Sequence, residues 1–526
     1  MLQLKRYLII FIFSLLFCSP IFYLVITNSP NEFKSKVINF DEENFTPRIN
    51  AINSSSPTIK LSYDARSYIG LNPSIQSDNY TGRGVTVAIM DSGIQANHSV
   101  FTFNGMFNWS HRIVAFYDAS FENVTNNPHD VQWHGTWTAS ILGGNSSTYK
   151  GVAPNVKFLI MKIFYIRNSE VVTDLQTYEK AVDWLLKNGY KYNVKIVSMS
   201  FGVKPDSANI DEIIEMNAIT KKLIDNGMLV VAAAGNDGNV PERNGYGTIN
   251  APASERSVLG VGGVYYDGKM YEKSSKGPTH ENIIKPDVCA PAVYVYGAYP
   301  SPLLNSYAYG TGTSASTPFV AGLAALMLEK NPSLSPEQLK SIICLTSVRT
   351  INPIYITDNV QGWGVVQGHA ALQALNLPIK ITQNSIIRGT LNNTNRVCCL
   401  PIELNPGQYY FELIANNSPT SVNMFLFNST PDKYGNPILK AHSINDFAVW
   451  ETSKKMGIQV YETSYFYLVI KSSTSSNIQF IIKLGSEFIN NVFVLILITN
   501  LVCLTFVVYL LKKVKRIDVD GLNKYS

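Results

Sequence analysis

The chain has 526 residues, of which 46% are hydrophobic and 15% are charged. At roughly 100–200 residues per domain, this length indicates two or three domains, and the apolar share is ordinary for globular proteins. The net charge of +5 is spread along the chain, apart from one run of cations near the C-terminus. The sequence shows no basic cluster of the kind that binds nucleic acid, so we exclude a nucleic-acid-binding function.

The first apolar stretch runs from Tyr7 to Ile26 and follows Lys5 and Arg6. A positive flank before an apolar core is the form of a secretory signal. A stretch of about 20 apolar residues is also long enough to remain in the membrane as an anchor. Because no clean cleavage site of small residues follows, we predict that residues 1–27 are either a signal peptide or a signal anchor.

Residues 28–62 are polar and show little periodicity, which predicts a linker or a short pro-region. Strand and helix signals then alternate over residues 63–375. The expected elements are a buried strand at 85–90, a helix that Asp174 caps and Gly189 ends, a strand at 194–199, a helix at 211–226 and a strand at 228–233. Strands separated by helices predict an α/β fold with a parallel sheet and helices on both of its faces.

The helical signal fades after residue 376. The β-like runs lie at 409–413, 422–427, 466–470 and 478–482, and turn residues such as Asn405-Pro406-Gly407 separate them. We therefore predict an all-β domain at 376–485, in the form of a sandwich.

A second long apolar stretch spans residues 492–511 and predicts a transmembrane helix at 488–511. The tail at 512–526 begins with a run of cations: Lys512, Lys513, Lys515 and Arg516. Cations directly after an apolar span are typical of a cytoplasmic stop signal. We therefore expect a cell-membrane protein whose tail is cytoplasmic and whose main part is extracellular, where its Asn-x-Ser/Thr sequons predict a glycoprotein.

Three local patterns contain side chains that are typical of nucleophilic catalysis. Asp91 stands where the buried strand ends, His134 precedes a run of small and apolar residues, and Ser314 lies in a Gly- and Thr-rich stretch. We expect a helix over 319–329, with Pro318 in its first turn. A serine hydroxyl is a poor nucleophile until a base takes its proton, and a helix N-terminus favours a developing negative charge. Alone, a serine in such a turn is more often only a helix cap.

A fourth pattern ends another strand with a side-chain amide. Asn236 follows the run Val230–Gly235 and precedes Asp237 and Gly238. An amide at such a place can donate a hydrogen bond to an oxyanion, whereas the same residues alone would form an ordinary tight turn.

Together, these four patterns resemble the subtilisin-like serine peptidases, the subtilases of family S8, in which the catalytic residues follow the chain order Asp, His, Ser. Further stretches at 198–202, 274–278 and 285–288 support the resemblance, which covers about 63–375. The resemblance implies that Asp91 orients and stabilises the imidazolium and that His134 is the general base and then the acid. It implies that Ser314 forms an acyl-enzyme and that Asn236 donates to the oxyanion.

The resemblance also implies where a protein or peptide substrate binds. One wall of the first specificity pocket would be formed by Ser200, Phe201 and Gly202, which would also pair with an extended substrate backbone. The other wall would be formed by Ala232, Ala233 and Gly235. No cofactor is required. Subtilases often bind structural calcium, for which Asp118, Asp130 and Asp287 are candidates, and we assign no metal site.

The chain departs from the family pattern around two of these residues. Trp133 and Trp137 stand where the family usually has Gly and His, on either side of the catalytic histidine. After the catalytic serine, Ala315 and Ser316 replace Met and Ala, and Phe319 replaces a later His. These departures leave the reacting groups in place and change the surroundings that determine specificity.

The sequence thus predicts a membrane-anchored serine endopeptidase that hydrolyses extracellular or surface proteins. The membrane contact is expected through the C-terminal helix, and through the N-terminal segment if it is retained. Two alternatives remain open. One is a membrane-tethered binding module on the same fold, and the other is a structural surface protein in which the β-domain has the main role. The β-domain resembles the sandwich domains that follow many secreted peptidases.

Overall fold

The computed structural model describes residues 63–72, 78–102, 111–205, 210–241, 244–303, 305–351, 356–382, 385–416, 422–443, 453–472, 474 and 476–485, together with the backbone of 38–39. The predicted signal segment 1–27, the transmembrane helix 488–511 and the tail 512–526 lie outside these residues. Of the predicted linker 28–62, only the short strand β1 (Ile38–Asn39) is described. Within the described ranges, no helix combines the length and apolarity that crossing a bilayer requires.

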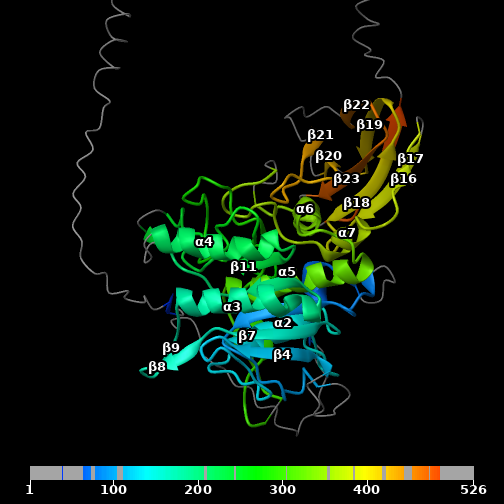
Figure 1. The fold of residues 1–526 in the computed structure, drawn as a ribbon. Helices are drawn as coiled ribbons and strands as arrows, with labels where there is room; N and C mark the ends of the chain where they lie inside the picture. Colours follow the sequence, from blue (N-terminus) through cyan, green and yellow to red (C-terminus); the bar gives the residue numbers. More distant parts are fainter. Residues whose placement is uncertain are drawn as a thin grey trace, which may run out of the picture. The chain divides into compact units, whose positions relative to one another are not determined.

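An 8-stranded sheet forms the centre of the α/β region (Figure 1). In sheet order its strands are β13 (Val288–Pro291), β12 (Leu259–Val264), β11 (Leu229–Ala233), β10 (Val194–Met199), β3 (Thr86–Asp91), β7 (Lys157–Lys162), β4 (Ile113–Asp118) and β5 (Asn123–Val124). All neighbours pair in parallel except β4 and the edge strand β5. Every residue of β3 is buried, as expected for a parallel strand that is covered on both faces.

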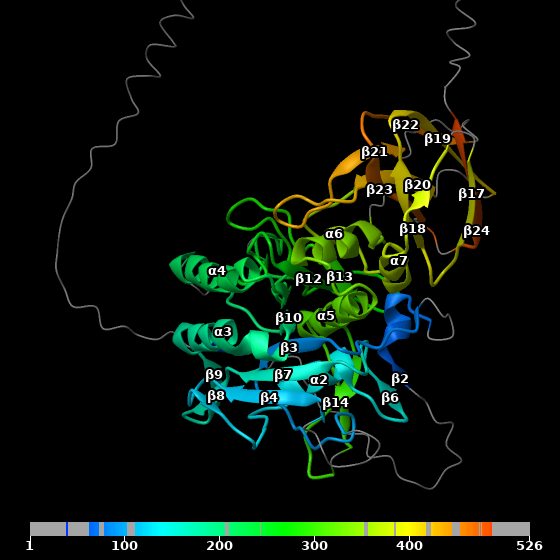
Figure 2. The ribbon, with the colours of Figure 1, turned by 45° about the vertical axis from the view of Figure 1, so that its right-hand side comes forward.

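Helices cover both faces of this sheet, as the sequence predicts (Figure 2). The helices of the α/β region are α2 (His134–Gly143), α3 (Leu175–Asn188), α4 (Ile210–Asp225), α5 (Thr313–Lys330), α6 (Pro336–Thr346) and α7 (Gly368–Gln373). Val87 and Ile89 of β3 pack in the core that contains α2 and α5. Ala88 and Met90 pack in the core that contains α3 and α4. The alternation follows from the period of two along a strand.

Helix α3 has the predicted ends. Asp174 is its N-cap and accepts a hydrogen bond from the backbone N–H of Thr177, while Gly189 follows its last residue. The buried face includes Tyr178, Val182 and Leu185, which follow the spacing of one side of a helix.

Helix α5 differs from the prediction. It begins at Thr313 instead of Phe319, so Pro318 lies inside the helix and not in its first turn. Proline has no N–H, so the carbonyl of Ser314, one turn earlier, has no donor within the helix. The hydroxyl of Ser200 donates to this carbonyl at 2.9 Å instead. A tertiary hydrogen bond therefore replaces the missing helical one and lets the helix start before the serine.

The remaining short elements lie around the sheet. They are β2 (Tyr63–Asp64), the 3₁₀ helices η2 (Ala65–Ile69) and η5 (Gly189–Tyr192), β6 (Tyr149–Lys150), β8 (Tyr165–Arg167), β9 (Glu170–Thr173), β14 (Val295–Ala298) and β15 (Tyr307–Gly310). Strands β14 and β15 form an antiparallel hairpin, and β15 leads directly to α5. Strand β1 pairs with β9, opposite Val172 and Thr173.

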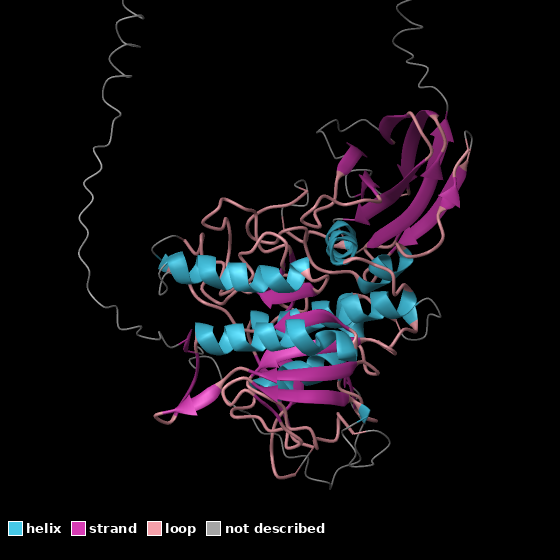
Figure 3. Ribbon diagram, viewed as in Figure 1, coloured by secondary structure: helices cyan, strands magenta, loops and turns pink. Residues whose placement is uncertain are grey.

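The C-terminal part is rich in β-structure, as predicted (Figure 3). Its strands are β16 (Ile379–Lys380), β17 (Ile386–Leu391), β18 (Val397–Leu404), β19 (Gly407–Ala415), β20 (Val422–Asn428), β21 (Leu439–Ser443), β22 (Lys454–Val460), β23 (Ser464–Ser472) and β24 (Ile478–Gly485). They form one sheet with the order β16-β18-β23-β20-β21 and a second with the order β17-β24-β19-β22. Side chains from both sheets share one hydrophobic core, which includes Leu404, Phe411, Leu468 and Phe480.

Candidate active site

Asp91 and His134 form a buried pair at the carboxyl end of β3. The Nδ1 atom of His134 lies 2.8 Å from Oδ1 and 3.0 Å from Oδ2 of Asp91. His134 is 5% exposed and Asp91 is 1% exposed. The carboxylate also accepts hydrogen bonds from the N–H of Ser92 at 2.7 Å and from the hydroxyl of Thr138 at 3.1 Å. Since a carboxylate only accepts, Nδ1 carries the proton, which leaves Nε2 as the basic nitrogen of the neutral ring.

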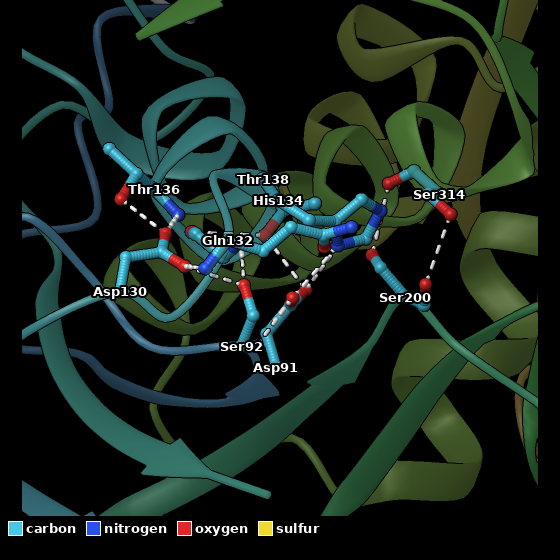
Figure 4. Close-up of polar contacts among 10 residues, drawn as sticks. Asp91, Ser92, Asp130, Gln132, His134, Thr136, Thr138, Ser200 and Ser314 are labelled. Carbon is cyan, nitrogen blue, oxygen red and sulfur yellow. Dashed lines mark hydrogen bonds and ion pairs between the residues drawn. The ribbon is translucent and has the colours of Figure 1, made fainter. Parts of the chain in front are cut away.

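Asp130 holds the start of the helix that carries His134. Trp133, which precedes α2, provides no side-chain cap. The carboxylate of Asp130 instead accepts from the N–H of Thr136 at 2.8 Å and from its hydroxyl at 2.5 Å, and it also accepts from the hydroxyl of Ser92 at 2.7 Å (Figure 4). The same Ser92 hydroxyl accepts from the N–H of Gly135 at 2.9 Å. Asp130 and Ser92 therefore join the loop after Asp91 to the first turn of α2.

Two glycines allow this close contact between the loop and the helix. Gly93 has a φ of 122°, and a Cβ built on it would lie 2.0 Å from the carbonyl oxygen of His129. A Cβ on Gly135 would lie 2.1 Å from the carbonyl oxygen of Gly93. A side chain at Gly93 would push the loop after β3 away from residues 129–130, and a side chain at Gly135 would push α2 away from the same loop.

Ser314 is the second residue of α5 and is partly exposed. Its hydroxyl donates to the carbonyl of Ser200 at 3.0 Å, in a reciprocal pair with the bond from the Ser200 hydroxyl to the Ser314 carbonyl. Figure 4 shows the imidazole of His134 between the carboxylate of Asp91 and Ser314. The structure thus brings together three predicted residues that are far apart along the chain.

Asn236 lies directly after β11 and next to the start of α5. Its Oδ1 accepts from the N–H of Thr313 at 2.9 Å and from the hydroxyl of the same residue at 3.2 Å. The Nδ2 end of the amide is near Gly312, where a Cβ would lie 3.3 Å from Nδ2. Because its oxygen is bound to Thr313, the amide presents its N–H₂ end beside the loop that carries Ser314.

The predicted substrate-binding residues follow two neighbouring strands of the sheet. They are Ser200, Phe201 and Gly202 after β10, and Ala232, Ala233 and Gly235 at and after the end of β11. The register pairs Met199 with Ala232, so both segments reach the same edge of the sheet. The ring of Phe201 is 6% exposed and packs against Phe164 and Tyr178, with centroids 5.8 and 5.9 Å away. The side chain of Phe201 therefore belongs to the core.

Asn250, which sequence reasoning missed, lies between these two segments. A Cβ on Gly202 would be 2.8 Å from Cβ of Asn250, and a Cβ on Gly235 would be 2.6 Å from its Cγ. Asn250 is 7% exposed, and its Oδ1 is buried without a hydrogen-bond partner within the described part of the chain. No local motif marks this asparagine, because tertiary folding alone brings it between the strand ends. Asp130 stands three residues before Trp133, the N-cap position of α2, so the usual capping pattern does not mark it either.

The three carboxylates considered for calcium each have protein partners. Asp118 pairs with buried Lys162 at 2.8 Å. Asp287 pairs with Lys285 at 2.6 Å and with Lys340 at 3.3 Å, and burial lowers the pKa of Lys285 to about 8. Asp130 caps α2. Among the described residues, no group of three or more His, Cys, Asp or Glu side chains is placed to hold a metal ion.

Sequence similarity to known proteins covers the segment that contains these residues. The family model described as the subtilase family (peptidase S8) matches residues 82–364, a range that contains Asp91, His134, Asn236 and Ser314. The chain belongs to the subtilase family. It is 32% identical to subtilisin DY of Bacillus licheniformis over 301 residues, which are 57% of this chain and 94% of that protein. It is 29% identical to subtilisin E of Bacillus subtilis over 304 residues, which are 57% of this chain and 69% of that protein.

Among solved structures, a cold-adapted subtilisin-like serine proteinase matches with a TM-score of 0.42 and 24% identity, over 55% of this chain and 91% of that one. From the family match, this subtilase is a subtilisin-like serine peptidase, a hydrolase. The subtilase match ends at residue 364 and does not include the C-terminal β-rich part.

Proposed function

We propose that this subtilase is an endopeptidase that hydrolyses peptide bonds through an acyl-enzyme, with Asp91, His134 and Ser314 as its catalytic triad. The observation that carries the proposal is the ring of His134, which Asp91 holds through Nδ1 at 2.8 Å and which lies beside Ser314 (Figure 4). A base next to a serine hydroxyl, oriented by a third group, is the arrangement that activates a nucleophile.

In the proposed reaction, the Ser314 hydroxyl leaves the carbonyl of Ser200 and gives its proton to Nε2 of His134 while Oγ attacks the scissile carbonyl. The buried carboxylate of Asp91 stabilises the imidazolium that forms. His134 then donates this proton to the leaving amine, which breaks the C–N bond. Water, with His134 again as base, hydrolyses the resulting ester on Ser314.

We assign the oxyanion donors to Nδ2 of Asn236 and the backbone N–H of Ser314. The first is supported by the Thr313 bonds that fix the orientation of the amide. The second is supported by the place of Ser314 in the first turn of α5, where backbone N–H groups have no helical acceptor. Loss of one such donor raises the barrier by about 2.7–4 kcal/mol, a magnitude measured on subtilisin.

The proposed substrate is an extended protein or peptide segment that lies along residues 200–202, with its side chain toward the segment 232–235. Asn250 between these segments would meet that side chain with a polar amide. No cofactor takes part in this scheme, because the side chains named supply the nucleophile, the base and the oxyanion donors.

For its location, we propose a cell-membrane protein with the peptidase outside the cytoplasm. The support is the apolar stretch 492–511 followed by cations, and the signal-like segment 1–27. In this proposal the β-rich part is a sandwich domain that separates the peptidase from the membrane. Its two sheets around one hydrophobic core support the sandwich, and its place in the chain between the peptidase and residues 492–511 supports the spacer role.

Hydrolysis of a denatured protein substrate by the purified full-length chain tests the proposal. Ser314→Ala is expected to abolish hydrolysis because the nucleophile is gone. Ser316→Ala is the matched control on the same helix, since within the described part of the chain its buried hydroxyl donates to the carbonyls of Ala290 and Pro291, away from Asp91 and His134. A wild-type chain that is folded and binds peptides without cleaving them would instead favour the binding-module alternative.

A further inference from the structure

Trp137, a departure from the family pattern, lies in α2 and is 2% exposed. Its indole lies against the ring of His134, with centroids 5.9 Å apart, and against Trp133 at 5.7 Å. A buried tryptophan beside a catalytic ring can simply fill the core. The surroundings of Trp137 indicate a more specific role.

The indole also lies against two glycines on one face of the β14–β15 hairpin. A Cβ on Gly297 would lie 2.2 Å from Cδ1 of Trp137, and a Cβ on Gly310 would lie 2.5 Å from its Cζ2. Neither glycine has a positive φ, so the backbone conformation does not require glycine at either position. Gly297 lies inside β14 and Gly310 is the last residue of β15, and a glycine in a strand often marks a place where another group approaches the backbone closely. The space that they leave is the space that the indole occupies.

Two hydrogen bonds fasten the same helix to the same hairpin. The indole Nε1–H of Trp137 donates to the carbonyl of Val295 at 3.2 Å. The N–H of Ala298 donates to the hydroxyl of Ser140 at 2.8 Å, and this hydroxyl donates to the carbonyl of Trp137 at 2.7 Å. Helix α2 therefore contacts the hairpin through packing and through hydrogen bonds at both ends of β14.

These contacts join the two elements whose separation sets the catalytic geometry. His134 is the first residue of α2. Strand β15 ends at Gly310 and continues through Thr311 and Gly312 into α5, which carries Ser314. A displacement of about 1 Å between reacting groups can cost on the order of 100-fold in rate.

We propose that Trp137 is a positioning residue for peptide hydrolysis: its indole, packed against Gly297 and Gly310, sets the distance between the imidazole of His134 and the Ser314 loop. This inference rests on the proposed function. It implies that the indole and the two glycines act together. A substitution of Trp137 should therefore alter the effect on kcat of a substitution at either glycine.

The first test compares Trp137→Phe with wild type in the full-length chain. The smaller ring loses the Nε1–H bond and the atoms that reach Gly310, so kcat should fall by about 10- to 100-fold while KM changes less than about twofold. Trp184→Phe is the control, because Trp184 lies on helix α3 and stacks on Tyr117 of β4, with ring centroids 4.6 Å apart. The kcat of this variant should stay within about twofold of wild type. A thermal unfolding curve for each variant shows that it is folded.

The second test uses suppression between the two sides of the contact. Gly310→Ala should lower kcat because its new methyl group overlaps the benzo ring of Trp137. In the Trp137→Phe background that ring edge is absent, so the same substitution should cost at least about threefold less. A folded Trp137→Phe variant with unchanged kcat would overturn the proposal. The proposal would also fail if the loss of kcat in the double variant equalled the product of the losses in Trp137→Phe and Gly310→Ala alone. If the wild-type chain cleaves no peptide, the proposed function fails instead.

Discussion

At the scale of single residues, Asn236 offers a substitution that separates structure from chemistry. Asn236→Asp keeps an oxygen that can accept from Thr313 but has no N–H to donate to an oxyanion. We expect kcat to fall by about 100- to 1,000-fold with a small change in KM, because the donor acts in the transition state. Steady-state kinetics checks this, and a melting temperature close to that of wild type shows that the fold is kept. An unchanged kcat would remove Asn236 from the oxyanion site.

A buried histidine outside the active site predicts how stability depends on pH. The ring of His98 is 0% exposed, its Nε2 lies 2.8 Å from the carbonyl of Ser306, and its Nδ1 accepts from the N–H of Val100. Burial lowers the pKa of His98 from 6.5 to about 4. The folded chain therefore prefers the neutral ring, and its contribution to stability is present above pH 6.5 and is lost as the pH falls toward 4.

Between pH 6.5 and pH 4, protonation of His98 in the unfolded chain is expected to lower the unfolding free energy of wild type by on the order of 3 kcal/mol. His98→Gln should lower the stability at pH 7 and weaken its decline between pH 6.5 and pH 4, as measured by urea unfolding at each pH. His129→Gln changes an exposed histidine and should leave the decline as in wild type. A decline of equal size in all three proteins would contradict the assignment.

The sequence alone marked the candidate site residues that stand in distinctive local patterns, and it did not mark the neighbouring residues that only tertiary contacts bring there. Asp91, His134, Asn236 and Ser314 stand in short patterns with distinctive neighbours, so they could be selected without a structure. Asn250 could not, because only the folding of distant segments places it between Gly202 and Gly235.

At the scale of elements, the first turn of α2 depends on one carboxylate. Asp130 accepts from the backbone and hydroxyl of Thr136 and from Ser92, and it thereby joins the two segments that carry Asp91 and His134, two of the proposed catalytic residues. Asp130→Ala should lower the unfolding free energy by about 1–3 kcal/mol and also lower kcat, because the helix start loses its cap. Chemical unfolding and kinetics measure the two effects. Asp225→Ala, at an exposed ion pair, should change neither beyond about 0.5 kcal/mol or twofold.

The two helices α3 and α5 show what decides whether an element can be predicted. The ends of α3 were predicted correctly because Asp174 and Gly189 are local signals. The start of α5 was predicted too late because a proline was assumed to mark the first turn. Inside the helix Pro318 leaves a carbonyl without a donor, and the hydroxyl of Ser200, distant in sequence, supplies the missing bond. A compensation of this kind is not visible in the sequence.

At the scale of the whole molecule, the β-rich part and the peptidase share a hydrophobic core. Phe425 and Phe427 of β20 and Val469 of β23 pack in the same cluster as α6 and α7, and the ring of Phe427 meets Trp363 with centroids 5.9 Å apart. Alternation in the sequence predicted the β-structure. It did not predict this shared core, because the pattern gives the faces of a strand without naming what covers each face.

The shared core predicts that damage to the β-rich part inactivates the peptidase. Phe427→Ala should lower the unfolding free energy by about 3–5 kcal/mol and should lower the temperature of activity loss together with the calorimetric midpoint. Tyr461→Ala, at a position that is 86% exposed, should leave both temperatures unchanged. Two separate transitions, with activity unaffected by Phe427→Ala, would show that the two parts unfold independently.

The most direct test of the account is to find where the substrate becomes covalently attached. A slowly hydrolysed ester of a short peptide acid, quenched in acid during turnover by the full-length chain, should leave one acyl group per molecule. Peptide mass mapping should place that group on Ser314, and His134→Ala should prevent its formation. An active wild-type chain that carries the acyl group on another residue, or that accumulates none under conditions in which deacylation is slow, would contradict the proposed mechanism.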